Sequence, residues 1–160
     1  MAETASVNSK PFDSISIPEL LYAEMLERAR SELPGECCGL LAGSIDAARI
    51  ARVRTLHPLV NELASPTEFR SEPRSMIAAL RQIDRAGQTL LAVYHSHPTS
   101  EPIPSRKDLR DSYDAAVAAV IVGMAGAEPE VRGWWLEGSQ QLTVRTEGRG
   151  ADSPPLLAPL

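Results

Sequence analysis

The sequence predicts an α/β (α+β) domain in which helices flank a mixed sheet. Two segments carry apolar residues at steps of three and four, which is typical of amphipathic helices. Several short runs rich in apolar and β-branched residues indicate strands around them. With 160 residues, the chain is long enough to bury most of its apolar surface in one domain with a single core.

The first half of this domain is expected to contain one helix and three strands. Serine and isoleucine alternate over residues 14–17, as they do in a short strand with one buried face. A helix over residues 19–33 places its apolar residues on one side and ends at a Pro-Gly pair. Two strands, 37–43 and 49–57, follow with a turn between them, so we expect them to pair in antiparallel fashion.

The second half is expected to contain two helices and four strands. A helix over residues 74–86 ends at Gly87, because glycine accepts the backbone conformation that follows many helices. A buried strand covers residues 90–94, and helix-start signals place a short helix over 105–114. The remaining elements are a central strand and a hairpin, at residues 116–122, 130–136 and 140–145.

The predicted domain covers residues 14–147 and lies between two segments of different composition. Residues 1–13 are expected to form a flexible N-terminal arm. Residues 148–160 contain three prolines and cannot form the interior of a helix or strand, so we expect this tail to be disordered. No stretch has the apolar core of a signal peptide or the length of a membrane span, so we expect a cytoplasmic protein without membrane contact.

Charge and cysteine content narrow the expected partners. The formal net charge is −5, and no run of lysine or arginine is long enough to follow a phosphate backbone, which argues against nucleic acid as a partner. The two cysteines, Cys37 and Cys38, are adjacent and cannot form an ordinary disulfide framework. Reduced thiols agree with a cytoplasmic location.

Two histidines at the end of the 90–94 strand are the most informative feature. His95 and His97 are two residues apart, so on a strand both side chains point to one face and can approach one metal ion. Asp108 falls in the first turn of the expected short helix, where backbone N–H groups and the helix dipole keep a carboxylate ionised. Three such ligands leave one corner of a tetrahedral zinc ion open to water, which is typical of catalytic sites.

Ser105 and Asp108 also fit a simpler interpretation. A serine followed three residues later by an acid, ahead of an apolar pattern, is a helix capping box. Taken alone, capping explains this pair better than metal binding does. The chain contains three histidines, however, and two of them precede this pair at short distance. The combination leads us to expect a metal site.

Three segments resemble the signature of the JAMM (MPN-plus) zinc metalloproteases. Residues 95–98 (His-Ser-His-Pro) are followed after six residues by 105–108 (Ser-Arg-Lys-Asp), which is similar to the metal-binding pattern of that family. Residues 34–41 (Pro-Gly-Glu-Cys-Cys-Gly-Leu-Leu) are similar to its upstream glutamate segment. The resemblance implies the JAMM/MPN (cytidine-deaminase-like) fold, a curved, mainly antiparallel sheet with a long helix on either side and one zinc ion per chain at the strand ends.

Roles are expected for five side chains. The predicted zinc ligands are His95, His97 and Asp108. Glu36 is the predicted general base, which accepts a proton from the attacking water and hands it to the departing amine, and the family resemblance assigns it the same role. Ser105 is the predicted donor to the tetrahedral oxyanion, a role that capping a helix does not prevent.

The resemblance also implies a substrate. JAMM enzymes typically cut after the C-terminal glycine of ubiquitin or a ubiquitin-like protein, and this short chain without inserts beside its motifs resembles the compact bacterial branch. The implied partner is a small ubiquitin-like sulfur-carrier protein with a C-terminal di-glycine, from which cysteine or a C-terminal extension is released. No substrate-binding residue is assigned, but residues 61–71 are expected to form a loop or edge strand near the cleft.

Three alternatives compete with this interpretation. A non-catalytic MPN scaffold would share the fold but lack the zinc set, which is intact here. A zinc nucleoside deaminase needs His-x-Glu or Cys-x-Glu followed by Pro-Cys-x-x-Cys, and neither pattern is present. A cysteine hydrolase built on Cys38 has no evident orienting partner. The sequence leaves open which carrier is cut and whether the chain is a monomer or a homodimer.

Overall fold

The computed structural model describes residues 10–112 and 114–148 and has a helix or strand in each segment where the sequence predicts one. In chain order the elements are β1 (Ser14–Pro18), α1 (Glu19–Ser31), β2 (Cys38–Ile45), β3 (Ile50–Leu59), α2 (Pro73–Arg85), β4 (Thr89–His97), α3 (Arg106–Arg110), β5 (Ala118–Gly123), β6 (Glu130–Trp135), a 3-10 turn (Glu137–Ser139) and β7 (Gln140–Glu147). The strand β4 continues through both histidines, as expected, and the largest difference from prediction is in α3, which ends at Arg110 instead of residue 114.

The long helix α2 begins and ends at local signals. The Glu72 side chain accepts hydrogen bonds from the backbone N–H groups of Arg74 and Ser75, at 3.2 and 2.9 Å. Pro73 occupies the first turn, where its missing N–H would have no helical partner in any case. Gly87 follows the helix with a φ of +65°, a left-handed conformation that agrees with its predicted role as a terminator.

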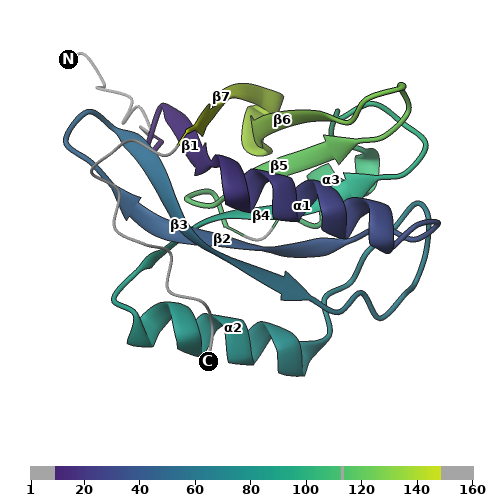
Figure 1. Cartoon of the computed structure of the whole chain (residues 1–160), viewed down its shortest axis with the longest axis horizontal. Coiled ribbons are helices and arrows are strands. Elements are labelled where there is room, and N and C mark those ends of the chain that lie inside the picture. Colours follow the sequence, from purple (N-terminus) through teal and green to yellow (C-terminus); the bar gives the residue numbers. More distant parts are fainter. Residues whose placement is uncertain (1–9, 113, 149–160) are drawn as a thin grey trace, which may run out of the picture.

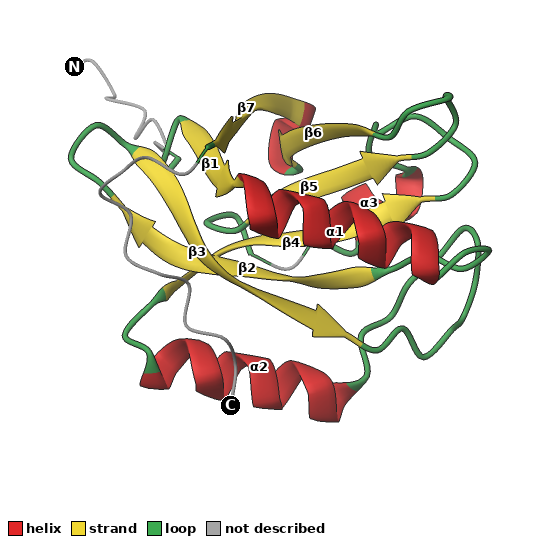
Figure 2. Ribbon diagram, viewed as in Figure 1, coloured by secondary structure: helices red, strands yellow, loops and turns green. Residues whose placement is uncertain are grey.

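The strands form one sheet in the order β1-β3-β2-β4-β5-β6-β7, and β1 closes it into a barrel by pairing in parallel with both β3 and β7 (Figures 1 and 2). Four of the seven strand pairs are antiparallel and three are parallel. The prediction of a curved, mixed and mainly antiparallel sheet flanked by helices is therefore confirmed. The closure by β1 was not predicted, because it joins the two ends of the domain.

The long helices α1 and α2 lie on opposite sides of this sheet (Figure 1). Strand β2 shows the division, because Leu41 packs in the cluster under α1 whereas Leu40 and Ala42 pack in the cluster under α2. Met25 and Ala29 bring α1 into the first cluster, and α2 contributes in the same way to the second. The expectation of a single core is thus wrong, because both faces of the central strands are covered by a helix.

The ends of the domain are only partly described. Most of the arm expected at residues 1–13 lies outside the described residues, but Phe12 is 1% exposed and packs 4.7 Å from the Trp135 ring. The folded domain therefore begins before residue 14. Of the tail expected at 148–160, all but residue 148 lies outside the described residues. No helix within the described residues combines the length and apolar character that a membrane crossing requires.

Candidate active site

Strand β4 places both histidines at one end of the sheet. It lies between β2 and β5, with His95 opposite Cys38 on one side and opposite Ile121 on the other. His95 and His97 are both buried, at 2% and 5% exposed. Their ring nitrogens Nε2 lie 3.2 Å apart, so the two side chains share one face of the strand as predicted.

Helix α3 brings Asp108 to the same point. Ser105 caps the helix, with its Oγ accepting from the backbone N–H of Asp108 at 3.1 Å and its own N–H donating to Asp108 Oδ2 at 2.8 Å. The same Oδ2 atom lies 3.2 Å from His95 Nε2 and 3.1 Å from His97 Nε2. Capping and approach to the histidines are therefore compatible, because the capping box fixes the carboxylate that faces them.

The three side chains form a triangle that fits a metal ion. Among the described residues, His95, His97 and Asp108 are a group of potential ligands close enough to share one ion. The edges of their triangle measure 3.2, 3.2 and 3.1 Å. Ligands about 2.0–2.1 Å from a tetrahedral zinc ion would be roughly 3.3–3.4 Å apart. The observed edges agree with that spacing to about 0.2 Å, and nitrogen and carboxylate ligands suit zinc.

The charges in the triangle also favour a cation. Burial opposes ionisation of Asp108, but hydrogen bonds from His95 and His97 outweigh it and hold the pKa of Asp108 far below its usual range. Burial likewise opposes charge on His97, yet its contacts with Asp108 and with the Glu101 carbonyl raise its pKa above the usual value. The site thus stabilises positive charge beside an ionised carboxylate. A bound metal ion would supply that positive charge.

The loop between β4 and α3 orients the ring of His97, a role that was not predicted from the sequence. Its Nδ1 lies 2.9 Å from the backbone oxygen of Glu101. Because a carbonyl only accepts, Nδ1 carries a hydrogen, so the neutral ring that a metal ion requires would have its lone pair on Nε2, facing the triangle. Trp134 Nε1 donates to the carbonyl of Pro102 at 2.9 Å, and a side chain at Gly123 would lie 2.4 Å from Pro102 Cδ. These contacts fix the loop over the strand end.

Glu36 lies on the connection between α1 and β2 and is 4% exposed. Burial raises the pKa of its carboxyl group to about 7, while the nearby charges of His97 and Lys107 lower it and that of Asp108 raises it. These charges show that the carboxyl group lies within electrostatic reach of the triangle. In the metal-free protein this carboxyl group therefore takes up a proton more readily than an ordinary glutamate does.

Ser105 keeps a free hydrogen despite its capping role. Its Oγ serves as the acceptor for the Asp108 N–H, so the hydroxyl hydrogen remains available to another acceptor. The side chain is half-buried next to the triangle. The structure therefore brings all five predicted site residues to one end of the sheet, and the roles of Glu36 and Ser105 remain predictions.

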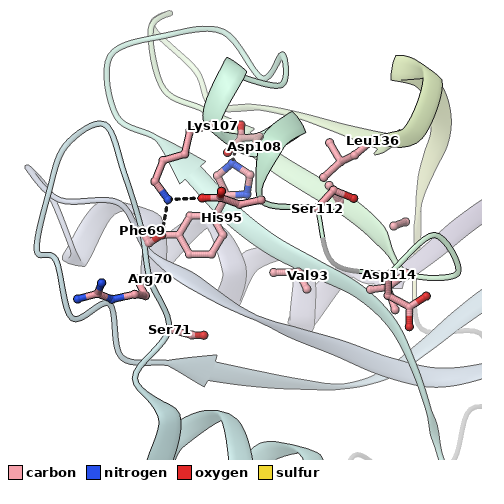
Figure 3. Close-up of a pocket in the computed structure, with 14 residues that line it drawn as sticks. Phe69, Arg70, Ser71, Val93, His95, Lys107, Asp108, Ser112, Asp114 and Leu136 are labelled. Carbon is pink, nitrogen blue, oxygen red and sulfur yellow. Dashed lines mark hydrogen bonds and ion pairs between the residues drawn. The ribbon is translucent and has the colours of Figure 1, made fainter.

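A pocket of about 240 Å³ opens beside the triangle (Figure 3). Val93, Ala118 and Ala119 are among its apolar lining residues. Phe69, from the loop expected near the cleft, also lines the pocket and stacks on His95 with ring centroids 4.7 Å apart. Lys107 Nζ links the loop around Phe69 to the end of α3: it lies 3.4 Å from the backbone oxygen of Phe69 and 2.7 Å from Asp111 Oδ2. Sequence analysis missed Lys107 because it read that residue only as part of the motif.

The burial of both cysteines disfavours their thiolate forms. Both thiols are buried and free. Burial raises the pKa of Cys37 to about 11 and that of Cys38 to about 12. Because the thiolate is the nucleophile, such thiols are almost entirely in the unreactive form at neutral pH. This finding argues against the cysteine hydrolase alternative.

Comparisons with known proteins point to one family. The family model described as prokaryotic homologs of the JAB domain matches residues 18–137. A probable TtuB-protein conjugate cleaving protease from Thermus thermophilus is 32% identical over 129 residues, which cover 80% of each chain. A CysO-cysteine peptidase from Mycobacterium tuberculosis is 34% identical over 103 residues, 64% of this chain and 68% of the relative. The solution structure of protein DSY2949 from Desulfitobacterium hafniense, at 29% identity and a TM-score of 0.77, covers 84% of this chain and 94% of that one.

These matches test the family resemblance directly. The matched residues 18–137 include the Glu36 segment, both histidines and Asp108. The relatives named above are a protease and a peptidase, so the predicted class of enzyme, a hydrolase of this family, is confirmed. The chain belongs to the prokaryotic JAB family.

Proposed function

We propose that the protein is a zinc-dependent peptidase for a small ubiquitin-like sulfur-carrier protein. It hydrolyses the amide bond that follows the C-terminal di-glycine of the carrier and releases cysteine or a C-terminal extension. The observation that carries the proposal is the triangle of His95, His97 and Asp108, whose edges of 3.1–3.2 Å fit the ligand spacing of tetrahedral zinc. Three protein ligands leave one position open, which is typical of a hydrolytic site.

The substrate class is supported by the names of two relatives. One is named for cleaving a conjugate of TtuB with a protein, and the other for a bond between CysO and cysteine. The pocket beside the triangle agrees with a polypeptide substrate, because its lining combines apolar side chains with the charged Arg70, Asp111 and Asp114. We propose that the chain next to the scissile bond lies in this pocket, against Phe69.

The chain's own residues supply the proton transfers. When bound, a zinc ion would lower the pKa of a water molecule toward 7 and polarise the scissile carbonyl. Glu36 accepts a proton from the water as the new carbon–oxygen bond forms. It then delivers that proton to the amine nitrogen as the carbon–nitrogen bond breaks, so one carboxyl group serves as base and then as acid.

Ser105 acts on the substrate, and His97 is oriented as a predicted zinc ligand. The Ser105 hydroxyl donates its free hydrogen to the carbonyl oxygen, where negative charge develops during attack. His97 keeps its Nε2 lone pair in the triangle because Nδ1 donates to the Glu101 carbonyl.

Two free, buried thiols also agree with a cytoplasmic location, which we include in the proposal.

The proposal is tested with purified carriers that bear cysteine, another amino acid or a short peptide after the di-glycine. The zinc-loaded protein should shorten at least one of them to the di-glycine end, as read by intact mass. A chelator should abolish the reaction and added zinc should restore it. The same carriers with the di-glycine replaced by di-alanine serve as controls. Cleavage that continues in the chelator would contradict the zinc mechanism, and cleavage of none of the carriers would contradict the substrate class.

A further inference from the structure

The peptide unit that joins Glu36 to Cys37 is held from both sides by side chains. Its carbonyl, that of Glu36, accepts from Asn61 Nδ2 at 3.0 Å. Its N–H, that of Cys37, donates to Ser96 Oγ at 2.8 Å. Asn61 comes from the loop after β3, whereas Ser96 lies in β4 between the two histidines. We call these two contacts the peptide clamp.

Main-chain contacts extend the peptide clamp. The N–H of Glu36 donates to the carbonyl of Ser65 at 2.8 Å, and the N–H of Ser96 donates to the carbonyl of Cys37 at 3.1 Å. Ser96 is fully buried, and Glu36 is 4% exposed, so little water can replace these bonds. Because a buried polar group that loses its partner is destabilising, these bonds hold the chain at Glu36 in one conformation.

Asn61 has a second set of contacts that shapes the loop. Its Oδ1 accepts from the N–H groups of Leu63 and Arg70, at 3.1 and 3.0 Å. Its Nδ2 also donates to the carbonyl of Glu68 at 3.2 Å. One side chain therefore both organises the loop around Phe69 and holds Glu36. Oδ1 contacts only the loop, whereas Nδ2 contacts both the loop, at Glu68, and the Glu36 carbonyl.

We propose that Asn61 and Ser96 are positioning residues, which fix the Glu36–Cys37 peptide and thereby aim the Glu36 carboxyl group at the metal triangle. Neither side chain touches the reacting atoms. Glu36 lies outside the regular elements, so its direction depends on these contacts instead of on a helix or strand. The inference rests on the proposed role of Glu36, and a displacement of about 1 Å at such a group can slow a reaction on the order of 10²-fold.

Asn61→Asp separates the two roles of Asn61. The variant keeps an acceptor for the Leu63 and Arg70 amides, so both loop contacts of Oδ1 are retained. It places a second oxygen against the Glu36 and Glu68 carbonyls, so it removes the Asn61 side of the peptide clamp together with one loop contact, that to Glu68. Thr67→Ala, an exposed change in the same loop, is the matched control. Ser96→Ala removes the other half of the peptide clamp.

The readouts are kcat and KM on the carrier substrate, the dissociation constant of zinc, and hydrogen exchange of the Cys37 amide in the metal-free protein. For Asn61→Asp we expect kcat to fall about tenfold, with KM and the zinc dissociation constant within about twofold of the wild type. Exchange at Cys37 should accelerate about tenfold or more. Combined with Ser96→Ala, the loss in kcat should be less than the product of the two single losses, because both act on one peptide.

Three results would overturn the inference. They are an unchanged kcat in Asn61→Asp, a rise in KM or loss of zinc affinity that accounts for the lower activity, and an unchanged Cys37 exchange rate in both variants. If the wild type cleaves no carrier, the proposed function fails, and the exchange measurement alone decides whether the peptide clamp exists. If the wild type is active and Asn61→Asp is equally active, the proposed function stands and the peptide clamp does not.

Discussion

The three predicted ligands and the predicted base are positioned by different kinds of structure. His95 and His97 are carried by the strand β4, and Asp108 is held in the capping box of α3. Glu36 lies on the connection before β2, and its position depends on a loop far along the chain. Regular elements thus fix the positions of the three predicted ligands, whereas contacts with distant segments fix the position of the predicted base. We therefore expect variants that remove metal and variants that remove only proton transfer to be separable.

The largest effect is expected for His97→Ala. The change leaves two protein ligands, so the protein should lose bound zinc together with its activity. Because the metal contributes several kcal/mol to transition-state stabilisation, kcat should fall more than about 10³-fold. Metal content and activity are measured on one preparation, with circular dichroism as the control for folding. A variant that retains stoichiometric zinc and activity would show that His97 is not a ligand.

Glu36→Gln tests the other half of the comparison. The substitution keeps the size of the side chain and removes the group that accepts a proton. We expect zinc content to stay at the wild-type level while kcat falls about 10²–10⁴-fold, the usual contribution of general acid–base catalysis. Atomic absorption and a steady-state assay give the two numbers. The role of Glu36 is excluded if the rate is retained.

Ser105→Ala should have a smaller effect on the rate. Removing one donor to the oxyanion costs about 10²–10³-fold in kcat. The same change removes the cap of α3, so the free energy of unfolding should also drop by about 1 kcal/mol. Ser105→Thr keeps both functions and is the control, measured by kcat and by urea unfolding. Wild-type kcat in the alanine variant, at saturating zinc, would leave Ser105 with the capping role only.

The smallest effect concerns the stability of the metal-free protein. Burial raises the pKa of Glu36 from its ordinary 4.5 to about 7, so the folded state prefers the protonated carboxyl group. Its contribution is fully present below pH 4.5 and is lost as the pH rises through 7. Relative to Glu36→Gln, the wild type should lose on the order of 1–3 kcal/mol of unfolding free energy between pH 4.5 and 8. Urea midpoints at both pH values measure this, and parallel curves for the two proteins would contradict it.

Local pattern was enough to predict the elements and the grouping of the three potential ligands, His95, His97 and Asp108. The β4 strand and its two histidines follow from a spacing of two, and the capping box of Ser105 and Asp108 follows from a spacing of three. These relations are contained within a few residues. The family resemblance then supplied the candidate base, Glu36.

Contacts between distant segments could not be predicted in this way. Strand β1 closes the barrel by pairing with β7, more than a hundred residues later, and no local signal encodes that register. Asn61, Ser96 and Trp134 support the site through hydrogen bonds to other segments. Their polar side chains look like ordinary loop or strand residues in the sequence. Their roles appear only when the partners are brought together by the fold.

We propose that one zinc ion, held by His95, His97 and Asp108, makes this chain a peptidase. Titration of zinc into metal-free wild-type protein, with cleavage of a carrier–cysteine adduct followed by intact mass, tests it most directly. We predict that the rate rises linearly and stops rising at one zinc ion per chain. Full activity before any zinc is added, or no activity at one zinc per chain, would contradict the claim.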